Sequence, residues 1–142
     1  MTFVATEPLL YADSSAVVKL IVEEPESAAL RERIRGRNLV SSDLVLAEVP
    51  RAIHRLAAMA GTPRRRFARR VEQILGGLAF VPLDREVLRR AGAFDRPSLR
   101  ALDAIHLAAA LDVADAIDGF VSYDERQIDA ARFAGLPVLS PG

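Results

Sequence analysis

The sequence of 142 residues contains no cysteine, no tryptophan and only two histidines, His54 and His106. Without cysteine, the chain cannot form disulfides, thiolate zinc sites or a cysteine nucleophile. The two histidines lie far apart, so a histidine-rich zinc site is not expected either. No apolar run reaches the ~20 residues of a membrane span, and no basic region followed by an apolar stretch opens the chain. We therefore expect a cytoplasmic protein that does not associate with membranes.

An excess of charge of one sign is also missing, because 19 basic and 19 acidic residues cancel. The charges are unevenly distributed: residues 31–70 hold eleven arginines against three acids, whereas residues 1–30 and 101–142 are net acidic. A basic segment is typical of a surface that binds nucleic acid or an acidic partner, and equally of a solvated helical face. The arginines within 31–37 and 64–70 are therefore candidates for contacts with a nucleic-acid backbone.

Half of the residues (51%) are hydrophobic, and the length suits one folded domain, which we assign to residues 1–142. Short apolar segments alternate with longer periodic ones, a pattern that predicts an α/β fold with a central parallel sheet of four to five strands and helices on both faces. The predicted strands are 8–12, 38–41, 78–83, 119–123 and 137–139. The predicted helices are 14–23, 26–35, 42–59 (capped by Ser42), 62–76 (beginning at Thr62 and Pro63), 84–93, 99–114 and 125–133.

Two predicted strands are followed directly by an acid, Asp13 after the first and Asp124 after the fourth. Sites in open parallel sheets form at the carboxyl ends of the strands, so both carboxylates are expected at one edge of the sheet. Taken alone, each is better explained by the ordinary role of a helix N-cap. We interpret Asp43 and Asp84 as caps only.

Two further acids, Glu48 and Asp103, lie inside largely apolar helical segments. If the helix of Asp103 begins near Leu99, this carboxylate lies in the second turn, where the helix dipole gives little stabilisation. A buried carboxylate without a partner costs several kcal/mol, on the order known for buried charges, or its pKa shifts. The possible partners are the other carboxylate through a shared proton, a metal ion, or one of three arginines, Arg51, Arg55 and Arg100.

Asp13, Glu48, Asp103 and Asp124 together suit a hard divalent cation, because oxygen ligands favour Mg²⁺ or Mn²⁺ over zinc. Such an ion can activate a water molecule and stabilise charge on a phosphodiester. Ser15, Ser122 and His106 are candidates to support these ligands, with His106 orienting Asp103. The alternatives are turn and capping hydrogen bonds for the serines, the preferred reading of the neighbouring Ser14, and a satisfied core histidine for His106.

Four segments carry a resemblance to PIN-domain ribonucleases, and within that family to the toxins of bacterial VapBC-type toxin–antitoxin pairs. They are YADSSAVVKL (11–20), SSDLVLAEV (41–49), LRALDAIHLA (99–108) and FVSYDER (120–126), in the order of the family's motifs and across nearly the whole chain.

The resemblance implies a Mg²⁺- or Mn²⁺-dependent endoribonuclease that cuts structured RNA, such as transfer or ribosomal RNA, at few positions. It assigns Asp13, Glu48, Asp103 and Asp124 as the acidic quartet. It also implies a homodimer, a cognate antitoxin that blocks the site, and binding of operator DNA only through that antitoxin. Pro50 lies two residues after Glu48 and lacks a backbone N–H, so it is expected to kink or shift the helix that carries Glu48.

Other classes fit the sequence less well. A receiver domain needs adjacent acids after the first strand and a lysine after a late strand, but two serines follow Asp13, and the single lysine, Lys19, lies in the first helix. A haloacid-dehalogenase phosphatase needs an acid where Ser15 stands. The remaining alternative is a non-catalytic PIN-like module that binds protein or RNA.

Overall fold

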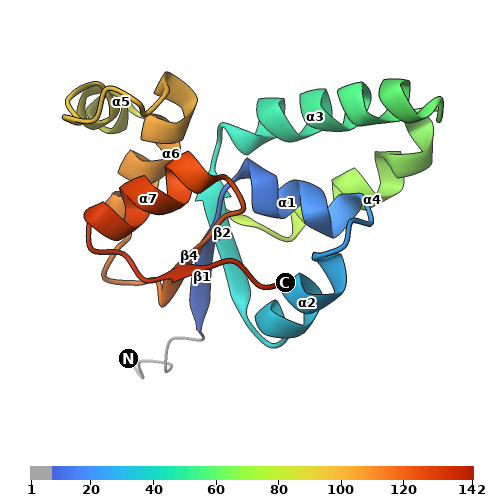
Figure 1. The fold of residues 1–142 in the computed structure, drawn as a ribbon, viewed down its shortest axis with the longest axis horizontal. Coiled ribbons are helices and arrows are strands. Elements are labelled where there is room, and N and C mark those ends of the chain that lie inside the picture. Colours follow the sequence, from blue (N-terminus) through green and yellow to red (C-terminus); the bar gives the residue numbers. More distant parts are fainter. Residues whose placement is uncertain (1–7) are drawn as a thin grey trace, which may run out of the picture.

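The computed structural model describes residues 8–142, in which five parallel strands form one sheet with helices on both faces (Figure 1). The strands are β1 (Leu9–Ala12), β2 (Asn38–Ser42), β3 (Ala79–Val81), β4 (Gly119–Val121) and β5 (Val138–Leu139). Their order across the sheet is β3-β2-β1-β4-β5. The α/β class and the parallel sheet predicted from the alternating segments are confirmed.

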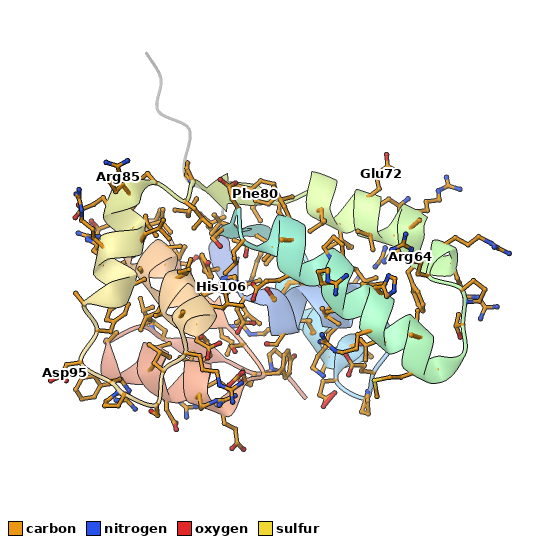
Figure 2. All side chains as sticks on the ribbon, turned by 90° about the horizontal axis from the view of Figure 1, so that it is seen from above. Arg64, Glu72, Phe80, Arg85, Asp95 and His106 are labelled. Carbon is orange, nitrogen blue, oxygen red and sulfur yellow. The ribbon has the colours of Figure 1, made fainter. Side chains whose placement is uncertain are left out.

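Seven helices surround this sheet within the described part of the chain, and none of them is both long enough and apolar enough to cross a membrane. They are α1 (Ser14–Ile21), α2 (Ser27–Ile34), α3 (Val45–Ala60), α4 (Arg65–Gly76), α5 (Arg85–Gly92), α6 (Ala101–Asp112) and α7 (Glu125–Phe133). In Figure 2, His106 of α6 lies near the centre of the molecule, whereas Glu72, Arg85 and Asp95 lie at its periphery.

The alternation of side chains along β1 divides the core into two layers. Leu10 and Ala12 face α1 and α3 on one side of the sheet, whereas Tyr11 faces α6 and α7 on the other. Tyr11 is fully buried and stacks on Phe120 of β4, with ring centroids 5.2 Å apart. Because β1 is central and the chain passes to β2 on one side and later to β4 on the other, the crevice between β1 and β4 is a topological switch point.

Two predicted helix starts are wrong. Ser42 does not cap α3; it pairs with Val81 as the last residue of β2, and its hydroxyl accepts a hydrogen bond from the backbone of Leu44. The next helix, α4, begins at Arg65 rather than at Thr62. In both cases the start signal is present, but the chain makes one more turn before the helix begins.

Asp43 and Asp84 were predicted to cap helices, and Pro50 was predicted to disturb the helix that carries Glu48. Asp84 caps α5 as expected, accepting a hydrogen bond from Val87 N at 2.9 Å. Asp43 is not a helix cap, because its carboxylate instead accepts a hydrogen bond from the backbone N–H of Leu83. α3 runs from Val45 to Ala60 with Pro50 inside it, and the kink or shift expected of this proline stays a prediction.

Candidate functional site

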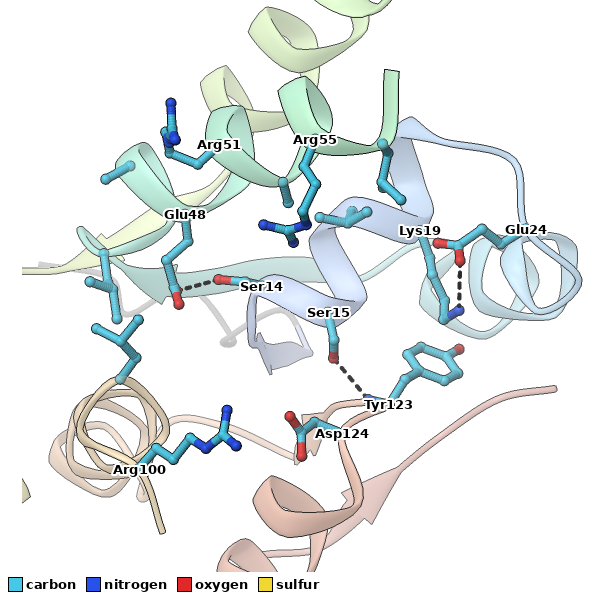
Figure 3. Close-up of a pocket in the computed structure, with 16 residues that line it drawn as sticks. Ser14, Ser15, Lys19, Glu24, Glu48, Arg51, Arg55, Arg100, Tyr123 and Asp124 are labelled. Carbon is cyan, nitrogen blue, oxygen red and sulfur yellow. Dashed lines mark hydrogen bonds and ion pairs between the residues drawn. The ribbon is translucent and has the colours of Figure 1, made fainter. Parts of the chain in front are cut away.

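A cleft of about 900 Å³ lies above the switch point of the sheet (Figure 3). Its walls come from α1, α3, the N-terminus of α6 and the connection from β4 to α7. Two of the four predicted acids, Glu48 and Asp124, line the cleft, whereas Asp13 is buried with an exposed fraction of 4%. The structure therefore brings segments far apart in the sequence to the sheet edge where the acids were expected.

Asp13 lies directly after β1 and caps α1. Its carboxylate accepts three hydrogen bonds, from Ser15 Oγ at 2.6 Å, Ser122 Oγ at 2.5 Å and Ala16 N at 3.2 Å. Burial nevertheless raises the pKa of Asp13, against the opposing effects of His106 and these hydrogen bonds. The two serines predicted to support the acids thus both contact Asp13, which serves as a helix cap and as a candidate ligand at once.

Asp124 is placed differently from expectation, because β4 ends at Val121 and not at residue 123. β1 and β4 pair so that Ala12 is opposite Val121, which sets Ser122 and not Asp124 beside Asp13. Asp124 begins α7 instead, and its carboxylate accepts hydrogen bonds from the backbone N–H groups of the first turn, at Arg126 and Gln127. Asp124 therefore caps α7 and also lines the cleft.

Glu48 extends from the first turn of α3 into the cleft. Its Oε1 atom accepts hydrogen bonds from the Ser14 hydroxyl and from His106 Nε2, the latter at 2.7 Å. On the other side of the imidazole ring, Nδ1 lies 2.8 Å from the Tyr11 hydroxyl. His106 was expected to orient Asp103; this is wrong, because the buried ring points toward β1 and contacts Glu48 instead.

Asp103 lies in the first turn of α6, because this helix begins at Ala101 and not near Leu99. Its carboxylate interacts with the Arg100 backbone and lies where the helix dipole favours an anion, contrary to the expected second turn. Burial, and next the negative charge of Asp124, raise the pKa of Asp103. The two carboxylates are therefore close enough to repel each other, which a bound cation would relieve.

The side-chain oxygens around the cleft are of the kind that binds a divalent cation. Within residues 8–142, no three side chains of aspartate, glutamate or histidine converge closely enough to form a ready-made metal cage. Mg²⁺ does not require one, since it keeps several waters and usually takes one or two carboxylates together with substrate phosphates. The cleft offers carboxylate and hydroxyl oxygens, and one of its acids, Asp124, is repelled by the neighbouring Asp103, so the residues present fit Mg²⁺ or Mn²⁺.

Three arginines supply positive charge at the same cleft. Arg55 of α3 and Arg100, which precedes α6, point into it from opposite sides, and Arg51 lies at its rim (Figure 3). They were predicted as possible partners of Glu48 and Asp103, but within residues 8–142 none of them forms an ion pair. Free guanidinium groups beside carboxylates are suited to hold the phosphates of a substrate.

Sequence reasoning missed the roles of Tyr11 and Ser14. Tyr11 reads as an ordinary core aromatic in a buried strand, and nothing near it in sequence points to His106. Ser14 reads as a capping residue because it follows Asp13. Only the packing of α1 against α3 and α6 shows that both side chains belong to the surroundings of Glu48.

The PIN domain family model matches residues 10–133 of this parallel α/β chain. The chain belongs to this family, which excludes the receiver and phosphatase alternatives. Ribonuclease VapC46 of Mycobacterium tuberculosis is 43% identical over 133 residues, covering 93% of this chain and 97% of that protein. Ribonuclease VapC47 of the same species is 34% identical over 139 residues, covering 94% and 98%.

A solved structure shares the fold. It is that of VapBC2 from Rickettsia felis bound to a DNA fragment from its promoter, with a TM-score of 0.63 and 13% sequence identity. The match covers 94% of this chain and 99% of that chain. The resemblance to PIN-domain proteins of the VapC type, identified from four short motifs, is thus confirmed along nearly the whole chain.

Proposed function

We propose that the protein is the toxin of a VapBC-type pair and acts as an endoribonuclease. The observation that carries this proposal is the cleft, in which the carboxylates of Glu48 and Asp124 lie beside arginines that have no ion-pair partner among residues 8–142. Relatives of matching length that are named ribonucleases support the same activity. A cleft with both kinds of charge can hold a metal ion and a phosphodiester side by side.

Asp13, Glu48, Asp103 and Asp124 would hold Mg²⁺ or Mn²⁺, and the bound ion would supply an activated water and relief of the charge on the scissile phosphate. The chain's own residues do the rest. Arg55 and Arg100 bind flanking phosphates from the two sides of the cleft, and Ser15 and Ser122 hold the Asp13 carboxylate in one orientation.

The proposed partners follow from the same assignment. They are a cognate antitoxin that covers the site, a second copy of the chain in a homodimer, and a structured RNA such as transfer or ribosomal RNA. Operator DNA would be bound only through the antitoxin, and the protein would act in the cytoplasm. The structural relative named above is a VapBC complex bound to promoter DNA, which supports an antitoxin partner.

The test is cleavage of total cellular RNA by purified protein freed of antitoxin, with Mg²⁺ or Mn²⁺ and with chelator. Discrete fragments are expected with either metal and none with chelator, and mapping their ends names the target. Calorimetry with Mn²⁺ is run on the same sample. Absence of both cleavage and metal binding would contradict the proposal and favour the non-catalytic binding module.

Asp124 offers a graded test, because an asparagine retains the capping oxygen and removes only the charge. Asp124→Asn is expected to lower the cleavage rate about tenfold, which corresponds to ~1.4 kcal/mol of transition-state stabilisation. The matched control is Asp129→Asn, an exposed residue of the same helix. Rates that are equal in the two variants would remove Asp124 from the proposed ligand set.

A further inference from the structure

We propose that His106 is a positioning residue that fixes one oxygen of Glu48 and leaves the other free for the metal ion; this rests on the proposed function. His106 and Glu48 belong to different helices, α6 and α3, and meet only in the folded chain. The claim concerns the orientation of the Glu48 carboxylate and gives His106 no contact with substrate.

Within residues 8–142, the hydrogen bonds to the Glu48 carboxylate all go to one of its two oxygens. His106 Nε2 and the Ser14 hydroxyl both bind Glu48 Oε1, and they lie 3.2 Å from each other. Within the described chain, Glu48 Oε2 makes no hydrogen bond, and the side chain lines the cleft with an exposed fraction of 20%. One oxygen is therefore held by the protein, while the other remains available to a ligand.

Tyr11 contacts the second ring nitrogen of His106. Since Glu48 is an acceptor, the tautomer with the proton on Nε2 suits this contact, and in that tautomer Nδ1 accepts from the Tyr11 hydroxyl at 2.8 Å. The tyrosine ring is fully buried on the α6 face of the sheet and stacks on Phe120, so the histidine has a rigid support. A glutamate held in this way loses less side-chain freedom when it binds a metal ion.

Two amide substitutions separate positioning from packing. In His106→Gln the amide nitrogen can reach the place of Nε2 and still donate to Glu48, whereas in His106→Asn it reaches only the place of Nδ1, beside Tyr11. We expect His106→Asn to raise the Mn²⁺ dissociation constant at least about tenfold, and His106→Gln to remain within about threefold of wild type. Calorimetry measures both, with thermal unfolding as the check on the fold.

Ser14→Ala provides a variant whose fold is not at risk, because Ser14 is partly exposed and alanine favours helix. It removes the second donor to Oε1, so a severalfold weaker Mn²⁺ affinity is expected. His54→Asn, at the chain's other histidine, is the matched control and should bind Mn²⁺ as wild type does, since the hydrogen bond of His54 within residues 8–142 is with the exposed Arg64, outside the cleft.

Equal Mn²⁺ affinities for His106→Asn, His106→Gln and wild type would overturn this inference, as would equal losses in the two His106 variants. Either result leaves the proposed function intact if the wild-type protein still binds Mn²⁺ and cuts RNA. Failure of the wild-type protein in both assays would instead contradict the proposed function itself.

Discussion

Replacing Asp13 by asparagine is expected to lower RNA cleavage by at least about a thousandfold, equivalent to ~4 kcal/mol, because it removes a proposed metal ligand. The same change should leave the metal-free fold as stable as wild type or more stable. Asp13 is buried, and burial raises the pKa of its carboxyl group. If the buried charge of Asp13 destabilises the fold but is needed for activity, its removal should lower RNA cleavage and raise the free energy of unfolding.

The pH dependence gives the sign of this stability effect. A carboxyl group whose pKa is higher in the folded than in the unfolded state destabilises the fold once it ionises. The stability advantage of Asp13→Asn should therefore be absent at a pH below the ordinary range of aspartate. It should grow as the pH rises through the raised pKa of the folded protein, and remain constant above it.

Thermal unfolding of chelator-treated samples across this pH range measures the effect, and RNA cleavage is assayed in parallel. Asp84→Asn is the matched control, since Asp84 caps α5 outside the cleft and asparagine is an equally good cap. Retained cleavage in Asp13→Asn would contradict the role of Asp13 as a ligand. A marked loss of stability at neutral pH would show that its charge serves the fold.

Replacing the three arginines of the cleft is expected to weaken RNA binding strongly. The combined Arg51→Ala, Arg55→Ala and Arg100→Ala variant is expected to raise the KM for RNA roughly fiftyfold at physiological salt and to flatten the salt dependence of log KM by about two units of slope. The reason is that three phosphate contacts with a single strand are lost. Binding of Mn²⁺ should persist, because these side chains are not ligands and, within residues 8–142, form no ion pair with the acids.

The matched control removes the same charge elsewhere. Arg85, Arg89 and Arg90 are exposed on α5, outside the cleft. The ion pairs of Arg89 with Glu86 and of Arg90 with Glu86 and Asp112 are of the surface type that contributes little. The triple alanine variant on α5 should keep the KM and salt slope of wild type. Equal changes in both triple variants would mean that RNA responds to net charge alone.

Much of this arrangement could be predicted because its signals are local. Alternation of apolar and periodic segments defines a parallel sheet, and in such a sheet the carboxyl ends of neighbouring strands share an edge. Asp13 follows β1 directly, so its position near the site followed from chain order alone. The same holds for Ser122, which directly follows β4 and reaches Asp13 across the sheet.

The remainder depends on register and packing, which a single sequence does not reveal. The pairing of Ala12 with Val121 decides that Ser122, and not Asp124, lies beside Asp13. A shift of two residues in the start of α6 moves Asp103 into the first turn and makes the helix dipole relevant. The partner of Glu48 is His106 and not an arginine, because the orientation of α6 turns this ring toward Glu48 and Tyr11.

The most direct test of the central claim is the location of the metal ion itself. A crystal of the protein grown with Mn²⁺ and measured for its anomalous signal is expected to show an ion in the cleft, in contact with Glu48 Oε2 and with one or more of Asp13, Asp103 and Asp124. The Asp13→Asn crystal should lack that peak or show it strongly reduced. A Mn²⁺ ion outside the cleft, or a cleft without one at saturating Mn²⁺, would contradict the account.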